Sequence, residues 1–309
     1  MNDALKGLYF FSRFAYSFSA LGYRQQRLFW KNLPTGFGGQ RWLVTGASGG
    51  IGRAITQGAA LHGANVVAAA RSAEKLTQLI DDVGENVTSL QSDLSLTHEI
   101  EDLLDELATP GNAKIDVLVN NVGVLLNKHQ LSGEGHELSF ATNLLNHYRL
   151  TSGLIERDLL ADDAVVINMS SGGMYNVPLS LDKLNTLDAE HYDGVLAYAY
   201  QKRAQVVLNS HWRERYADRA WQFFVMHPGW VDTEGVKTSL PAFRKLFQHV
   251  LRDAEAGADT ALWLASARPV QEDNGAIWFD RRQRSAYLGS STRRDSDSAE
   301  ALVEFLDSL

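Results

Sequence analysis

The stretch "RWLVTGASGGIG" (residues 41–52) decides the fold. Its first half, 41–46, is an apolar run typical of a short buried strand. Gly46, Gly50 and Gly52 then follow this strand and open a helical pattern over 52–63. Such an order lets the chain turn tightly and bring backbone N–H groups close to a pyrophosphate at the helix N-terminus. A plain glycine turn is the alternative, but the position after the first strand favours a dinucleotide site.

Downstream of this turn, strand and helix patterns alternate along the chain. The alternation predicts a Rossmann-type, doubly wound α/β fold, with a parallel sheet of about seven strands and helices on both faces. We expect Ser72 and Thr97 to be helix N-caps, and Gly84 to lie just past a helix end. The further strands are expected at 64–70, 86–93, 115–121, 164–170, 220–229 and 275–279, and the helices at 72–84, 97–107, 134–160, 195–216 and 255–265.

The regular pattern indicates one domain over 40–290, flanked by an N-terminal helical extension (1–39) and a C-terminal tail (291–309). Residues 32–40 are rich in Gly and Pro and are typical of a linker. The composition excludes several function classes. The net charge of −8 gives no general basic surface for nucleic acid, and the lack of cysteine excludes disulfides and thiolate sites. The lack of cysteine fits a cytoplasmic enzyme. The histidines form no metal-ligand cluster, so we expect no metal site.

The N-terminal extension allows two interpretations. Between Lys6 and Lys31 it carries five basic residues and no acidic one. It is too short and too polar to span a membrane, and it lacks a secretory cleavage site. Residues 1–30 could therefore lie on a membrane surface, or they could pack on the domain or a partner subunit. A helix over 8–21 would place these apolar side chains on one face: Phe10, Phe11, Phe14, Phe18 and Leu21.

A candidate acid–base pair lies in "LAYAYQKR" (196–203). On a helix, Tyr198 and Lys202 are neighbours one turn apart, whereas Tyr200 points elsewhere. A nearby cation lowers the pKa of a phenol, so Tyr198 could act as an acid or base near neutral pH. The alternative is a pair of structural aromatic residues beside a solvated lysine.

Taken together, these motifs resemble the short-chain dehydrogenase/reductase family. "TGASGGIG" (45–52) is similar to its TGxxxGxG motif, and the others follow in the family's order: "NNVG" (120–123), "SFATNLL" (139–145), "INMSSGG" (167–173), "YAYQK" (198–202) and "HPGWVDT" (227–233). The resemblance covers about 41–280. Within the family, "SSGGM", "MHPGW", "GADTALWLA" and "FDRR" resemble the retinol-dehydrogenase-like branch, in particular the dehydrogenase/reductase member-twelve group.

The resemblance implies an NAD(P)(H)-dependent oxidoreductase that interconverts a carbonyl and an alcohol on a lipophilic substrate. Tyr198 would be the general acid/base, and Lys202 would lower its pKa and bind the nicotinamide ribose. Ser171, chosen over Ser170, would hydrogen-bond the reacting oxygen, and Asn143 would hold a water that links Lys202 to solvent. Family members are often homodimers or homotetramers. An NADP(H)-binding regulatory or scaffolding protein is the alternative, which the intact set of four residues argues against.

The family's cofactor-binding positions fall on five stretches of this chain and on the acid–base pair. Ala70 stands where an acidic residue would repel a 2′-phosphate, and Arg71 offers a planar guanidinium suited to phosphate. NADP(H) is therefore predicted, with NAD(H) as the alternative. The implied binding residues are Gly46, Ser48, Gly50, Ile51, Arg71, Asp93, Leu94, Asn121, Gly123, Tyr198, Lys202, Pro228, Gly229, Val231 and Thr233.

The chain departs from the family pattern at several places. Val122 replaces the usual Ala of NNAG, and 172–194 is a long insertion before Tyr198, expected to form a substrate-side loop. Residues 234–251 are expected to form a mobile lid. Met174 and Tyr175 are expected to line the pocket. Three residues could contact a lipophilic substrate or belong to the core: Phe243, Leu246 and Phe247.

Overall fold

The apolar runs of the sequence form one central sheet. The structure is a computed structural model that describes residues 12–271, 275–289 and 295–309. Eight strands lie in the order β3-β2-β1-β4-β5-β6-β7-β8. They are β1 (Arg41–Thr45), β2 (Asn65–Ala70), β3 (Val87–Gln91), β4 (Ile115–Asn120), β5 (Leu160–Met169), β6 (Gln222–Met226), β7 (Ala276–Phe279) and β8 (Arg282–Ser285).

The fold class predicted from the sequence is confirmed, with one strand more than expected. Strands β1 to β7 pair in parallel, and β8 pairs antiparallel with β7 at the edge. Asp280 and Arg281 make the tight turn between them with positive φ angles of 50° and 56°. The strand "RQRS" is polar and largely exposed, so no apolar alternation marked it in the sequence.

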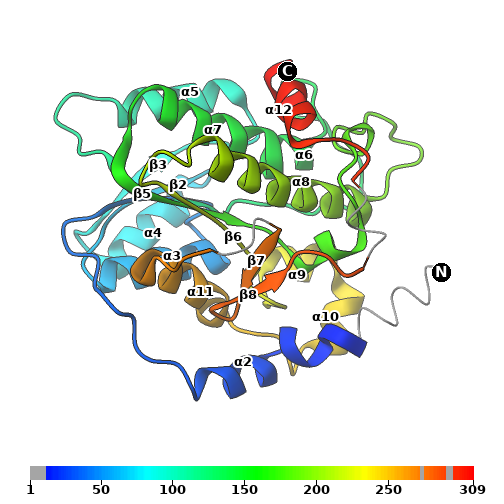
Figure 1. The fold of residues 1–309 in the computed structure, drawn as a ribbon, viewed down its shortest axis with the longest axis horizontal. Helices are drawn as coiled ribbons and strands as arrows, with labels where there is room; N and C mark the ends of the chain where they lie inside the picture. The colour runs from blue at the N-terminus through cyan, green and yellow to red at the C-terminus, as the bar shows by residue number, and fades with distance from the viewer. Residues whose placement is uncertain (1–11, 272–274, 290–294) are drawn as a thin grey trace.

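Helices cover both faces of the sheet (Figure 1). One layer contains α3 (Gly50–Leu61), α4 (Ala73–Val83) and α11 (Ala254–Ala267), which share a core with the sheet. The other contains α5 (Thr97–Leu107), α7 (Asn146–Glu156), α8 (Gly194–Arg215) and the C-terminal helix α12 (Ala299–Asp307). The strand order reverses between β1 and β4, which opens a crevice at the carboxyl ends of the strands.

Helix ends depend on both local and remote partners. As predicted, Ser72 accepts a hydrogen bond at the start of α4, and Gly84 ends that helix with φ at 96°. The prediction for Thr97 was wrong, because Leu96 holds the N-cap position of α5 and has no side chain that can cap. The Glu134 carboxylate instead accepts from the N–H groups of Thr97 and His98 at 2.8 and 3.3 Å. Burial raises the pKa of Glu134, but these hydrogen bonds outweigh it and bring the pKa to about 2.

The predicted helix over 134–160 consists of three consecutive pieces. It begins at α6 (Leu138–Phe140), continues through a π-helical turn (Ala141–Leu145), and ends as α7 at Glu156. π-Helical turns are frequent at functional sites because they place one side chain out of the regular helical spacing.

The N-terminal segment packs on the domain. It is helical over 12–18, and the break at Ser19 caps a second helix, α2 (Ala20–Arg27). Phe18 is 1% exposed and lies in a core with Phe279, while Phe14 packs beside it. Because of this break, Leu21 points outward and is exposed. The prediction that Leu21 shares one apolar face with the other residues of 8–21 was therefore wrong. Phe10 and Phe11 lie outside the described residues.

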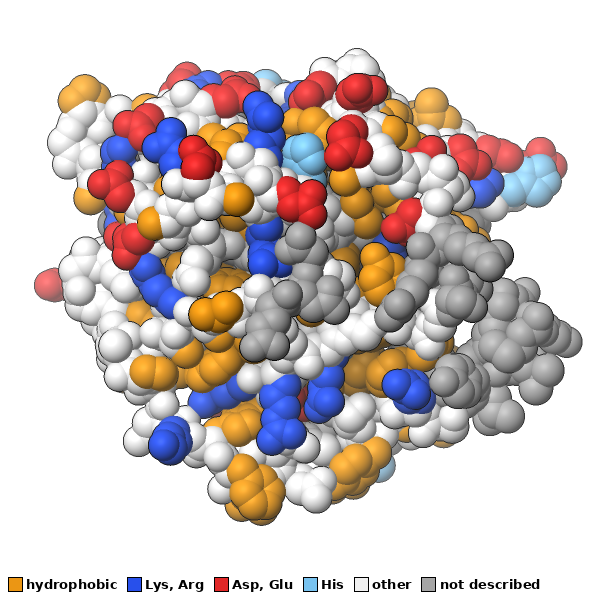
Figure 2. Space-filling view, viewed as in Figure 1, with side chains coloured by type: hydrophobic (Ala, Val, Ile, Leu, Met, Phe, Trp, Pro, Cys, Tyr) orange, Lys and Arg blue, Asp and Glu red, His pale blue; other side chains and the backbone are white. Residues whose placement is uncertain are grey.

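The outer surface of this segment is apolar and basic. Leu28 and Phe29 are 81% and 76% exposed, and Arg24, Arg27 and Lys31 are exposed beside them. Figure 2 shows Lys, Arg and hydrophobic side chains in the lower part of the view, over α2, and most Asp and Glu side chains in the upper part. Membrane contact stays a prediction. Within the described residues, no helix has both the length and the apolar character needed to cross a bilayer.

Candidate active site

A cavity of about 290 Å³ opens at the carboxyl ends of β1, β4, β5 and β6. It brings together residues that lie far apart in the sequence, from the glycine-rich turn to the segment after β6. The cavity is lined by Gly46, Gly49, Gly50, Ile51, Asn121, Val122, Gly123, Met169, Ser170, Tyr198, Lys202, Pro228, Thr233, Glu234 and Gly235.

The glycine-rich turn forms one edge of this cavity. Gly46 and Gly50 have φ angles of 64° and 51°, a region that disfavours other residues. A Cβ atom on Gly52 would lie 2.3 Å from the Gly46 carbonyl oxygen, so the turn closes tightly on itself. Gly49 occupies the N-cap position of α3 and has no side chain to make a capping hydrogen bond. The backbone N–H groups at the start of α3 therefore suit a diphosphate, and this edge fits a dinucleotide.

The end of β4 supports the same edge through Thr45. The Thr45 hydroxyl accepts from the N–H groups of Asn121 and Val122 at 2.9 and 3.0 Å. The Asn121 side-chain amide donates to the Thr45 carbonyl oxygen at 2.8 Å. These hydrogen bonds thus join residues 45–46 and 121–123 into one unit. Val122, which replaces the usual Ala of NNAG, fits within it.

Tyr198 and Lys202 of α8 both face the cavity. Lys202 Nζ lies 5.5 Å from the centre of the Tyr198 ring and donates to the Met169 carbonyl oxygen at 2.8 Å. Burial lowers the pKa of Lys202 to about 7. Burial also raises the pKa of Tyr198, against a hydrogen bond from Ser171 that lowers it. Tyr200 packs against the core of the α5–α7–α8 layer instead.

The two serines after β5 have different partners. The Ser170 hydroxyl lines the cavity but donates to the Lys202 carbonyl oxygen at 2.8 Å, so it ties β5 to α8. The Ser171 hydroxyl accepts a hydrogen bond from the N–H of Gly173, and it also hydrogen-bonds to the Tyr198 side chain. Ser171 is therefore the serine beside the phenol, although it is not part of the cavity lining.

Asn143 lies on the π-helical turn, behind Gly123. A Cβ atom on Gly123 would be 3.3 Å from Asn143 Oδ1 and 3.4 Å from Lys202 Nζ, so both side chains lie close to Gly123. Asn143 Oδ1 accepts from the Val124 N–H, and Nδ2 donates to the Val124 carbonyl oxygen, both at 2.8 Å. Nδ2 also donates to Gln201 Oε1 at 2.7 Å. The amide is held in one orientation by these bonds.

A buried carboxylate stands behind Asn143 and had no sequence signal. Glu137 accepts from Gln201 Nε2 at 2.9 Å and from the Tyr192 hydroxyl at 3.0 Å. It also accepts from the N–H groups of Ser139 and Phe140. Gln201 and Glu137 are 64 residues apart, so no local pattern could have linked them.

Arg71 and Asp93 lie at the ends of β2 and β3, outside the cavity lining. Arg71 is exposed, and its Nη1 is 3.9 Å from Asp93 Oδ2. The Ala47 N–H donates to the Ala69 carbonyl oxygen at 3.2 Å, which places the end of β2 beside the glycine-rich turn. Four other predicted cofactor-binding residues also do not line the cavity: half-buried Ser48, buried Leu94 and Val231, and Gly229, which packs on Arg252.

The segment after β6 forms the opposite edge. Pro228 and Thr233 line the cavity, and Thr233 caps α9 (Glu234–Ser239), which leads to α10 (Pro241–Phe247). Ser239 Oγ donates to the Leu125 carbonyl oxygen at 2.5 Å, so α9 is bonded to the loop after β4.

Two residues that were expected in the pocket lie elsewhere, and two of the aromatic residues after β6 pack together. Met174 and Tyr175 were expected in the pocket, but both are buried in a core with Phe18, because the insertion turns inward after Ser171. Phe243 and Phe247 pack with Trp230 at 5.2 and 4.9 Å, whereas Leu246 is 74% exposed. Within the described residues, no group of acidic or histidine side chains could hold a metal ion.

Comparisons place the chain among known proteins. Residues 40–180 match the family described as short chain dehydrogenase. Human dehydrogenase/reductase SDR family member 12 is 36% identical over 282 residues, 88% of this chain and 86% of that protein. Human retinol dehydrogenase 13 is 26% identical, over 80% of this chain and 78% of that protein. The crystal structure of an uncharacterised protein from Mycobacterium paratuberculosis has a TM-score of 0.70 and 25% identity, over 90% of this chain and 95% of that chain.

Proposed function

The chain belongs to the short-chain dehydrogenase/reductase family, and we propose that it interconverts a carbonyl and an alcohol with Tyr198 as the general acid/base. The fold of this family binds NAD(P), and the bound nicotinamide supplies or accepts the hydride. One observation carries the proposal. Tyr198 and Lys202 line the same cavity as the glycine-rich turn.

In the reducing direction, Tyr198 donates its proton to the carbonyl oxygen. Because burial raises the pKa of Tyr198, the phenol keeps its proton at neutral pH and is ready to donate it. Ser171, which reaches the same hydroxyl, can donate to the substrate oxygen and stabilise the charge that develops there.

Lys202 supports this transfer through its charge. With a pKa of about 7 it is partly neutral in the free protein, and an anion in the cavity favours its charged form. The charged ammonium group, 5.5 Å from the Tyr198 ring centre, then stabilises the phenolate left after proton donation. Asn143, which like Lys202 lies close to Gly123, would hold the water that exchanges the proton with solvent.

NADP(H) is the proposed cofactor rather than NAD(H). Arg71 is exposed just past β2, beside the glycine-rich turn, where a guanidinium can bind a 2′-phosphate in a bidentate manner. Ala70 removes the carboxylate that would accept hydrogen bonds from a free 2′-hydroxyl. Asp93 lies close enough to orient the Arg71 side chain.

The proposed substrate is an apolar carbonyl or alcohol. The relationship to retinol dehydrogenase 13 supports this class. So does the aromatic cluster of Trp230, Phe243 and Phe247, which lies along α10 and next to the cavity edge. Val195, exposed at the start of α8, adds apolar surface one turn from Tyr198.

The test is NADPH oxidation, with NADH in parallel, against aldehydes, ketones, retinoids and steroids. We expect turnover by the wild type and a loss of at least about 100-fold in Tyr198→Phe, because the proton donor is removed. Tyr200→Phe, two residues away, is the matched control and should keep its activity. Equal turnover by Tyr198→Phe and wild type would contradict the assignment. Tight NADPH binding without turnover on any substrate would instead favour a regulatory protein.

A further inference from the structure

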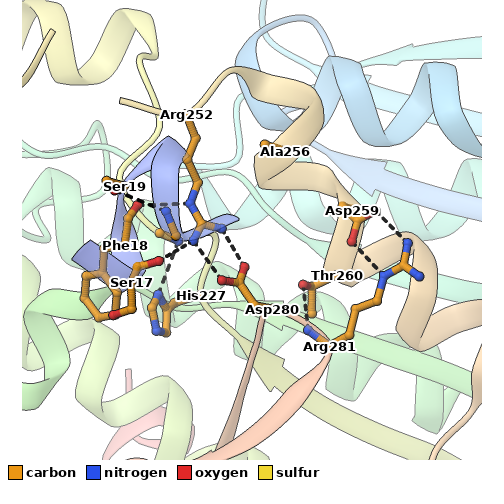
Figure 3. Close-up of polar contacts among 12 residues, drawn as sticks. Ser17, Phe18, Ser19, His227, Arg252, Ala256, Asp259, Thr260, Asp280 and Arg281 are labelled. Carbon is orange, nitrogen blue, oxygen red and sulfur yellow. Dashed lines mark hydrogen bonds and ion pairs between the residues drawn. The ribbon is translucent and has the colours of Figure 1, made fainter. Parts of the chain in front are cut away.

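One buried cation, Arg252, joins the N-terminal segment to the rest of the domain (Figure 3). Its side chain is only 2% exposed. The guanidinium donates to the carbonyl oxygens of Ser17 and Phe18 at 2.6 and 3.0 Å. It also makes two hydrogen bonds with the Asp280 carboxylate, at 2.6 and 2.9 Å. The charge is therefore balanced, and two of its donors depend on the backbone of the N-terminal segment.

The same residue holds the segment that lines the cavity. The Arg252 N–H donates to the Trp230 carbonyl oxygen at 2.7 Å, and the Asp232 N–H donates to the Arg252 carbonyl oxygen at 2.9 Å. From the other side, the Trp230 N–H donates to the Phe18 carbonyl oxygen at 3.0 Å. Residues 228–233 are thus held between Arg252 and Phe18.

Arg252 contacts residues 228–233 so closely that a displacement of one would move the other. A Cβ atom on Gly229 would lie 2.6 Å from Arg252 Nε, which leaves no space between the backbone and the guanidinium. At the other end of the segment, a Cβ atom on Gly50 would lie 3.4 Å from the Thr233 methyl group. The segment therefore spans from the buried cation to the glycine-rich turn.

We propose that Arg252 is a positioning residue for the cofactor: together with Asp280 it fixes Ser17 and Phe18 against residues 228–233, and so holds Pro228 and Thr233 in place at the cavity. This inference rests on the proposed function. Releasing the N-terminal segment would leave guanidinium donors buried without acceptors, which is costly. Dinucleotide binding and docking of the N-terminal segment should therefore be coupled, and thermodynamic linkage makes that coupling reciprocal.

A matched control lies beside it in Figure 3. Arg281 makes two hydrogen bonds with Asp259, at 2.8 and 2.7 Å, and donates to the Lys31 carbonyl oxygen at 2.8 Å. It therefore also ties the N-terminal segment to the domain by an Arg–Asp pair. None of its hydrogen bonds among the described residues goes to 228–233, so its loss should spare the cavity.

The experiment compares Arg252→Met, Phe18→Ala and Arg281→Met with the wild type in the full chain. NADPH affinity is measured by titration, and the melting temperature is measured without nucleotide. We expect Arg252→Met and Phe18→Ala each to weaken NADPH binding about tenfold, and Arg281→Met to change it less than about twofold. Phe18→Ala and Arg252→Lys carry the test if Arg252→Met does not fold.

A second readout separates positioning from a loss of stability. Hydrogen exchange of residues 12–20 should slow when NADPH binds to the wild type and to Arg281→Met, but not to Arg252→Met. Folded Arg252 and Phe18 variants that bind NADPH like the wild type would overturn the inference. A wild type that binds neither NADPH nor NADH would contradict the proposed function, and the inference with it.

Discussion

The two edges of the cavity are built in different ways. The first edge, 45–52 with 121–123, is held by backbone and side-chain bonds between the ends of two adjacent strands. The second edge, 228–233, is held by Phe18 and Arg252, and through Arg252 by Asp280. The bonds that hold the first edge lie within that edge. The second edge instead depends on contacts between Arg252 and Phe18, which are 234 positions apart in the sequence.

This difference separates two kinds of sensitivity. The first edge should respond to an atom added at Gly46 or Gly52, because a Cβ atom at either position would lie within 3.0 Å of backbone. The second edge should tolerate small changes at the cavity and respond to changes in its remote supports. Variants at each edge can therefore test this difference.

The largest effect is expected from Gly52→Ala at the first edge. Its Cβ would lie 2.3 Å from the Gly46 carbonyl oxygen and 2.5 Å from Asn121 Nδ2, so the turn must open. We expect a loss of about 1–3 kcal/mol in stability and of up to about 100-fold in NADPH affinity. Gly235→Ala in α9, just past the second edge, is the control. Its Cβ would meet only Thr233 Oγ1, at 3.8 Å, and binding should be unchanged. Equal losses at both positions would remove the contrast.

A smaller effect is expected where the first edge meets the end of β2. Arg71→Asp should weaken NADPH binding about tenfold, because an exposed charge-assisted hydrogen bond is replaced by repulsion. NADH binding should hold or improve. Parallel titrations of the two nucleotides measure the change in preference. Unchanged NADPH affinity would show that the 2′-phosphate is not bound by Arg71.

The smallest effect is a pH dependence of stability from Lys202, which lies between the edges. Its pKa is about 7 in the folded protein and 10.5 in the reference state, so between these values the unfolded chain binds more protons. Stability should therefore rise with pH in this window, by about 1 kcal/mol between pH 7 and 8. Melting curves of the wild type and Lys202→Met, taken without nucleotide, test this. A rise of equal size in both proteins would assign it to other groups.

Features governed by local spacing could be predicted from the sequence. The glycine-rich turn, the four-residue step from Tyr198 to Lys202 and the cap at Ser72 each involve residues within one turn or one loop. The fold class followed from the alternation of strand and helix patterns, because apolar runs of that length must be buried in layers. The family membership was predicted from the same motifs.

Features that depend on remote partners could not be predicted in this way. Thr97 was expected to cap α5, but Glu134 from a distant loop takes that role. Met174 and Tyr175 follow the predicted catalytic serine and were expected in the pocket, yet Phe14 and Phe18 cover Tyr175 in the core. In both cases the competing group lies far away in the sequence, so the local sequence around the residue does not predict it.

The sequence alone thus determined seven of the eight strands, the order of elements along the chain and the residues at the first edge of the cavity, since hydrophobic periodicity and turn chemistry act over short distances. Only the tertiary structure decided how the N-terminal segment docks, which carboxylate balances Arg252, and what holds the second edge. Those contacts join residues as far apart as Phe18, Arg252 and Asp280. The packing of the whole chain determines which acceptors surround a buried charge, so these acceptors cannot be predicted from local residue spacing.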